Sequence, residues 1–110
     1  MMVQAVLRVG DLPQAPLDAA AAFHADWLPA ARAAMGNGDL VIVFQPAGHD
    51  HRAWRLAVVQ ELAREAAPLR VNGISGVDEA AIAETAAYLV SAPGITGQML
   101  AVDGKSGKTD

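Results

Sequence analysis

The chain has 110 residues and no cysteine, with 8 Lys and Arg against 12 Asp and Glu. This length allows one domain with one modest core. The lack of cysteine excludes a disulfide framework, a thiolate nucleophile and a cysteine-built zinc site. A net charge of −4 argues against a nucleic-acid-binding surface.

Hydrophobic residues make up 53% of the chain, but 24 of them are Ala, so the core consists largely of small side chains that each bury little area. We expect such a thin core to gain stability from a partner surface, most simply a second copy of the chain.

The sequence has no run of 18 strongly apolar residues, and its first residues lack a basic segment followed by an apolar one. The first observation argues against a membrane-spanning helix, and the second argues against a secretory signal. We therefore expect a cytoplasmic protein that binds neither membranes nor nucleic acid.

Short β-branched runs alternate with longer Ala-rich stretches along the chain. Residues 3–9 have the apolar pattern of a strand. Residues 16–35 have the three- and four-residue spacing of a helix, which Pro29 is expected to kink or break. Residues 40–44 form a continuous apolar run, which is typical of a strand buried on both faces.

A second helix is predicted to follow the loop after this strand. Asp50 is its expected N-cap, and the helix should continue to about residue 67. Its apolar face is predicted to include Trp54 and Ala57, whereas Arg55 should lie on the solvated face.

The last predicted elements are a strand at 69–74, a helix that begins at Asp78 or Glu79 and ends before Pro93, and a strand at 98–102. Strands that alternate with helices imply right-handed crossovers and a parallel sheet. The fold class is therefore α/β, with the order β-α-β-α-β-α-β and four parallel strands.

Motifs in the second half of the chain are more specific than this pattern. Residues 70–76 read RVNGISG, and residues 95–104 read ITGQMLAVDG. The first motif resembles R-V-N-x-I-x-P-G of the short-chain dehydrogenase/reductase family, with Ser75 in place of Pro, and the second resembles that family's I-T-G-Q-x-L-x-V-D-G-G. Residues 62–65 and 79–91 are similar to the helices that accompany these motifs in the family.

The resemblance extends over residues 27–105 and covers the carboxyl-terminal half of the family's fold. It implies a Rossmann-like half-domain, with the first two helices on one face of the sheet and the third helix on the other. A single truncated domain would then occupy residues 1–105, followed by a flexible tail at 106–110.

The residues that carry the family's activity have no counterparts here. The family's general acid/base Tyr falls on Gly48, its Lys on Arg52 and its Ser on Gln45. No subset of the ten glycines fits the family's glycine-rich dinucleotide-binding turn. We therefore assign no catalytic residue, no cofactor-binding residue, no cofactor and no metal ligand, and we expect a pseudoenzyme.

A pocket is still expected where the carboxyl ends of the parallel strands meet. The polar residues predicted to line it are Gln45, His49, His51, Arg52 and Ser75. Two histidines flanking Asp50 could bind a metal or transfer a proton, but a helix cap with solvated imidazoles is the favoured interpretation. Arg52 could bind an anion, although solvation at the surface is the simpler role.

Three interpretations of function remain open. In the first, the protein acts without catalysis as a homodimer, or as a hetero-oligomer with a full-length short-chain dehydrogenase, because helices similar to 16–35 and 50–66 form subunit interfaces in the family. The candidate interface residues are Trp27, Trp54 and Met99, and the two tryptophans could equally belong to the core. In the second, the pocket serves a small-ligand-binding protein or an atypical oxidoreductase. In the third, the chain has no selected activity.

Overall fold

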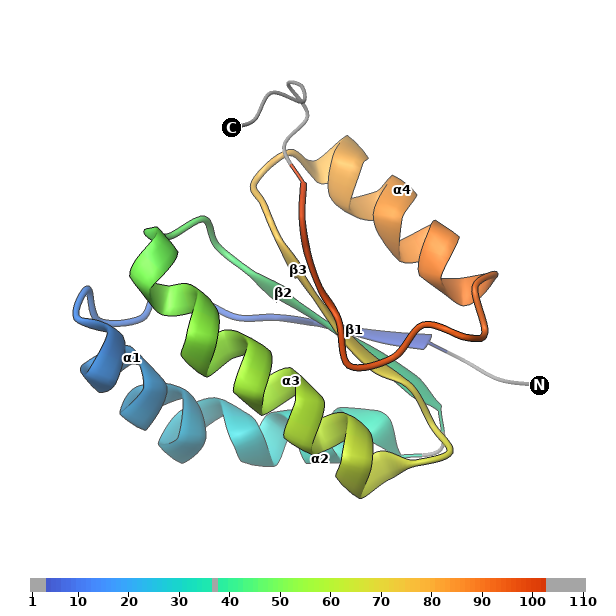
Figure 1. The fold of residues 1–110 in the computed structure, drawn as a ribbon, viewed down its shortest axis with the longest axis horizontal. Helices are drawn as coiled ribbons and strands as arrows, with labels where there is room; N and C mark the ends of the chain where they lie inside the picture. Colours follow the sequence, from blue (N-terminus) through green and yellow to red (C-terminus); the bar gives the residue numbers. More distant parts are fainter. Residues whose placement is uncertain (1–3, 37, 103–110) are drawn as a thin grey trace.

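A computed structural model describes residues 4–36 and 38–102 of the chain. Four parallel strands form one sheet, and their order in space is their order in the sequence (Figure 1). They are β1 (Gln4–Arg8), β2 (Asp39–Phe44), β3 (Val71–Ser75) and β4 (Met99–Ala101). The predicted α/β class and four-stranded parallel sheet are confirmed. The tail expected at 106–110 lies outside the described residues.

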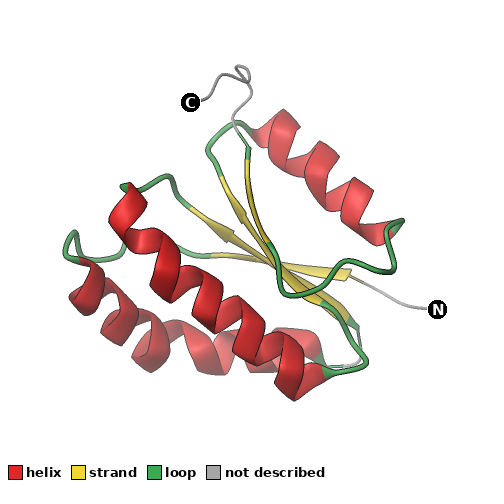
Figure 2. Cartoon of the chain, in the orientation of Figure 1, coloured by secondary structure: helices red, strands yellow, loops and turns green. Residues whose placement is uncertain are grey.

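Helical segments fill each of the three crossovers between strands. They are α1 (Pro16–Ala22), the π-helical turn η1 (Phe23–Trp27), α2 (Leu28–Met35), the 3-10 turn η2 (His49–His51), α3 (Arg52–Ala66) and α4 (Glu79–Val90). Figure 2 shows the first two crossovers packed together on one face of the sheet and α4 alone on the other, as the resemblance implied. Within the described residues, none of these helices has the length and apolarity needed to cross a membrane.

Two separate hydrophobic clusters hold these layers together. The larger lies between the sheet and the first two crossovers and includes the fully buried Phe23, Ile42 and Phe44. The smaller lies under α4 and includes Val41 and Ile74. Alternate residues of β2 thus point to opposite clusters, which explains why this strand is apolar at every position from 40 to 44.

The first helix changes its hydrogen-bond pattern near Pro29, as its sequence predicted. The chain does not leave the helix. Instead, the backbone N–H of Leu28 donates to the carbonyl of Phe23, five residues earlier. Pro29 then lies in the first turn of α2, a position in which proline is tolerated. One widened turn therefore absorbs the proline, and the helical path bends there but continues without a break into α2 (Figure 1).

Two predictions for the second crossover are wrong. Asp50 is not the N-cap of α3, because it lies within η2 and its side chain makes no capping hydrogen bond. The helix is also rotated from its predicted orientation, so that Ala57 is exposed while Arg55 and Val59 are buried. Burying Val59 in place of Ala57 removes more apolar area from water, and the same rotation turns Arg55 inward.

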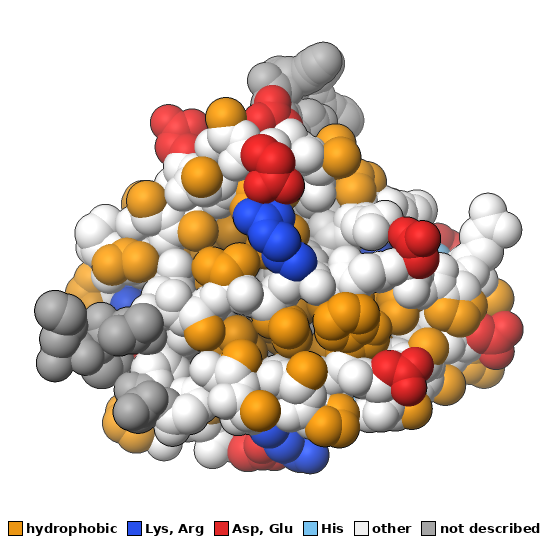
Figure 3. Space-filling view, turned by 180° about the vertical axis from the view of Figure 1, so that it is seen from behind, with side chains coloured by type: hydrophobic (Ala, Val, Ile, Leu, Met, Phe, Trp, Pro, Cys, Tyr) orange, Lys and Arg blue, Asp and Glu red, His pale blue; other side chains and the backbone are white. Residues whose placement is uncertain are grey.

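The α4 face of the sheet is only partly covered. Asp78 caps α4 by accepting a hydrogen bond from the backbone N–H of Ala81 at 3.1 Å. On the edge strand β1, however, Val6 remains 44% exposed, and an ion pair between Arg8 and Glu79 lies beside it. Figure 3 shows this side from behind, where hydrophobic side chains are visible between scattered charged ones.

Candidate functional site

The carboxyl ends of the parallel strands meet at one end of the sheet, and two adjoining hollows open there. The larger has a volume of about 470 Å³ and lies between the loops that follow β1 and β2. The smaller has a volume of about 170 Å³ and lies between the amino-terminal part of α3 and the ends of β3 and β4. His51 and Arg55 are part of both walls.

Four of the five predicted pocket residues line the smaller hollow, namely His49, His51, Arg52 and Ser75. The fifth, Gln45, lines the larger hollow next to it. The convergence arises because η2 and α3 start beside the end of β2, and β3 is the next strand of the sheet. None of the residues that line the smaller hollow is acidic.

His51 is buried and fully hydrogen-bonded, so the expectation of two solvated imidazoles is wrong for this residue. Its Nδ1 lies 3.1 Å from Nε1 of Trp54, and its Nε2 lies 2.9 Å from the carbonyl oxygen of Gln14. An indole N–H only donates, so Nδ1 must accept and Nε2 must carry the proton that Gln14 accepts. His51 therefore connects the loop after β1 to the first turn of α3. His49, by contrast, is exposed.

Within the described residues, the loops beside these hollows do not bring together a set of metal ligands. Both ring nitrogens of His51 are already occupied, so this residue offers no lone pair to a cation. In the part of the chain that the structure describes, no group of three or more His, Asp or Glu side chains could hold a metal ion.

The charged residue at the centre of the site is Arg55, which the helical pattern predicts on the solvated face. It is 7% exposed, and its guanidinium carbon lies 4.7 Å from the centre of the Phe44 ring and 5.8 Å from the Trp54 ring. Burial lowers the pKa of Arg55 from its usual value. A signal for this position existed, because Arg55 is one helical turn from both His51 and Val59 and shares their face.

The candidate interface residues lie at the margins of the larger cluster. Trp27, Trp54 and Met99 are each partly buried and pack against it. Trp54 packs against Phe23 in a tilted arrangement, with 5.7 Å between the ring centres. It also lines a third hollow of about 360 Å³ between α2 and α3, on the outer surface of the helical layer. Trp54 thus contributes both to the core and to a surface groove.

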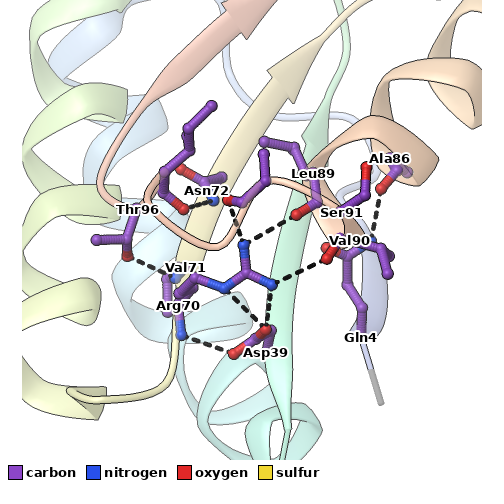
Figure 4. A network of polar contacts seen from close by, with 12 residues as sticks. Gln4, Asp39, Arg70, Val71, Asn72, Ala86, Leu89, Val90, Ser91 and Thr96 are labelled. Carbon is purple, nitrogen blue, oxygen red and sulfur yellow. Dashed lines mark hydrogen bonds and ion pairs between the residues drawn. The ribbon is translucent and has the colours of Figure 1, made fainter. Parts of the chain in front are cut away.

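The residues of the RVN motif lie at the opposite end of the sheet, where they form a polar network (Figure 4). Arg70 pairs with Asp39 at 2.8 Å and donates hydrogen bonds to the carbonyls of Leu89 and Ala92. Asn72 accepts a hydrogen bond from the backbone N–H of Gln98 at 3.0 Å. The network joins β2, β3, α4 and the turn before β4. The motif therefore has a structural role and is remote from the hollows.

Comparison with known proteins agrees with this architecture. A family described as short chain dehydrogenase-like protein matches residues 7–102. No curated protein and no solved structure matches the chain. The family match includes all of β2, β3 and β4 and each of the helices described above, and so covers nearly the whole described fold. The chain belongs to the family of short-chain dehydrogenase-like proteins.

Proposed function

We propose that this protein acts without catalysis, by pairing with a second copy of itself through the outer surface of α2 and α3. The observation that carries the proposal is the groove between these two helices. It is a hollow of about 360 Å³ that is open to solvent and lined by the apolar Leu28, Trp54, Val58 and Leu62. An apolar groove of this kind on the surface of a small domain favours contact with another protein.

The rim of the groove carries both signs of charge. Arg32 of α2 donates two hydrogen bonds to Glu65 of α3, at 2.8 and 2.9 Å, and these bonds lower the pKa of Glu65. Glu61 also lines the groove and pairs with Arg64. A two-fold axis places a surface against itself, so a rim with both charges can face its own copy without net repulsion. This argues for a second copy over a partner of one strong charge.

Small side chains beside the groove allow a close approach. Ala57 of α3 lines the groove and is exposed, and Ala53, one turn before it on the same helix, is exposed as well. Alanine at such positions lets the backbones of two helices come near each other. Helices similar to α2 and α3 form subunit interfaces in the short-chain dehydrogenase family, and Trp54 is the aromatic residue that lines the groove between them here. Trp27 and Met99 do not line the groove, so they would not contact the second copy within it.

The proposed oligomer is tested by the mass of the protein in solution. Light scattering coupled to size exclusion should give twice the chain mass of 11.4 kDa at high concentration, with dissociation on dilution. A mass of one chain at every concentration would contradict self-association. The remaining alternative would then be a hetero-oligomer, in which a full-length short-chain dehydrogenase binds the same groove.

A protein that acts without catalysis should not bind the family's dinucleotide cofactor. Gly48 and Arg52 stand where the family has its acid/base Tyr and its Lys, and the loop after β1 has Gly10 as its one glycine. We expect calorimetric titration with NAD(H) and NADP(H) to show no binding in the micromolar range. Micromolar binding of either would refute the non-catalytic interpretation and favour an atypical oxidoreductase. The other alternative, a small-ligand protein, rests on a separate observation, the buried guanidinium of Arg55.

A further inference from the structure

Arg55 is the one charged side chain buried in the described residues that makes neither an ion pair nor a side-chain hydrogen bond. Its Nε is completely buried and has no hydrogen-bond partner. None of the ion pairs between described residues includes it. Arg70, the other deeply placed arginine, shows the contrast, because it pairs with a carboxylate and donates to several carbonyls. A buried charge without a partner destabilises a folded protein strongly.

The aromatic contacts of Arg55 do not replace such a partner. The faces of Phe44 and Trp54 attract the guanidinium. They offer no acceptor to its N–H groups, however, and a ring face compensates only part of the lost hydration. The lowered pKa of Arg55 agrees with this, since burial is its only cause. An acceptor that comes from outside the chain would satisfy the group.

Of the two hollows beside Arg55, the smaller suits an anion better. Its wall adds the second guanidinium of Arg52 and the hydroxyl of Ser75, and it contains no Asp or Glu. The larger hollow is lined by Asp11 and Asp50, which would repel a negative ligand. The amino-terminal turns of α3 also border the smaller hollow and add a positive potential to it.

The size and the remaining wall indicate what kind of anion fits. A hollow of about 170 Å³ admits only a small molecule, and Met99 and Ala101 form an apolar part of its wall. A guanidinium pairs bidentately with carboxylates and with phosphates, and the apolar part of this wall favours an anion with a short apolar chain. We propose that the smaller hollow binds a small organic carboxylate, with its oxygens on Arg55 and Arg52 and its short apolar chain against Met99 and Ala101.

The proposal is tested by following the Nε–H resonance of Arg55 in the ¹⁵N-labelled full chain during titration with sodium butyrate. We expect this resonance to shift and to saturate at lower concentrations of butyrate than of inorganic phosphate or chloride at equal ionic strength. No saturation with butyrate at millimolar concentration would overturn the proposal. Tighter binding of phosphate than of butyrate would overturn the assignment to a carboxylate.

Substitutions of Arg55 test whether this residue binds the carboxylate. Arg55→Met should weaken butyrate binding by about tenfold or more. Without ligand it should raise the midpoint of thermal unfolding, because it removes the uncompensated charge. Arg64→Gln is the matched control, since it removes one positive charge from an exposed position of the same helix and should bind as the wild type does.

Arg55→Lys keeps the charge but not the planar fork, so it should fold and bind several-fold more weakly than the wild type. This variant keeps the test valid where Arg55→Met does not fold. Equal affinity of the wild type and Arg55→Lys would overturn the assignment to Arg55. The proposal is independent of self-association, because the groove between α2 and α3 and the smaller hollow have none of their lining residues in common.

Discussion

At the scale of single residues, the two deeply placed arginines differ in what surrounds them. Arg70 lies at the amino end of the sheet, where Asp39 and backbone carbonyls accept its hydrogen bonds. Arg55 lies at the carboxyl end, against aromatic rings and an open hollow. The contacts of Arg70 join two strands and a helix, whereas the guanidinium of Arg55 keeps N–H groups that can donate to a ligand. The same residue type therefore serves architecture at one end and a candidate site at the other.

Because Asp39 pairs with the mostly buried Arg70, loss of the Asp39 carboxylate should lower the free energy of unfolding strongly. Asp39 is 4% exposed, so Asp39→Ala would leave the Arg70 guanidinium without its carboxylate in a mostly buried position. We expect a loss of about 3 kcal/mol in the free energy of unfolding. Urea titration followed by circular dichroism measures it. The matched control is Glu79→Ala, which breaks the exposed pair with Arg8 away from the groove and should change stability very little.

The sequence predicted the location of the site better than its chemistry. Because strands alternate with helices, their carboxyl ends must meet, so His49, His51, Arg52 and Ser75 could be grouped before the fold was known. The hydrogen bonds of His51 could not be foreseen, since Gln14 belongs to a different loop. Arg55 was missed because a charged residue on an amphipathic helix is usually solvated.

At the scale of elements, apolar periodicity and turn residues located every strand and helix, while helix orientation required tertiary information. The adjacent Val58 and Val59 allow two apolar faces for α3, and the sheet selects the one that buries both. Asp50 resembles an N-cap in the sequence, but the chain enters α3 through a 3-10 turn in which its side chain caps nothing. Both errors concern choices that depend on packing partners distant in sequence.

The junction of β3 with β4 gives a sharp prediction at this scale. A Cβ at Gly76 would overlap the backbone carbonyl of Val102, and a backbone atom cannot move aside as a flexible side chain can. Gly76→Ala should therefore cost roughly 1–3 kcal/mol in the free energy of unfolding. Gly94→Ala is the control, because nothing lies near a Cβ there. Equal stability of the two variants by thermal unfolding would contradict the close packing of this junction.

At the scale of the whole molecule, the β1 edge of the sheet and the groove between α2 and α3 are both open to contact. The β1 edge has no strand beyond it among the described residues, and Val6 is exposed there beside the charged pair of Arg8 and Glu79. Charges at an edge strand discourage pairing with another sheet. The groove between α2 and α3 has an apolar floor and a rim of both charges. The groove is therefore the better surface for association.

The central claim is that two copies pair through this groove, and one pair of variants tests it most directly. Ala57 is exposed and lines the groove, whereas Ala87 is exposed on α4, far along the chain. Ala57→Glu and Ala87→Glu add the same charge to a solvated helical position. Light scattering should show that the wild type and Ala87→Glu have twice the chain mass and that Ala57→Glu has the mass of one chain. A dimer that persists in Ala57→Glu, or is lost equally in both variants, would contradict the account.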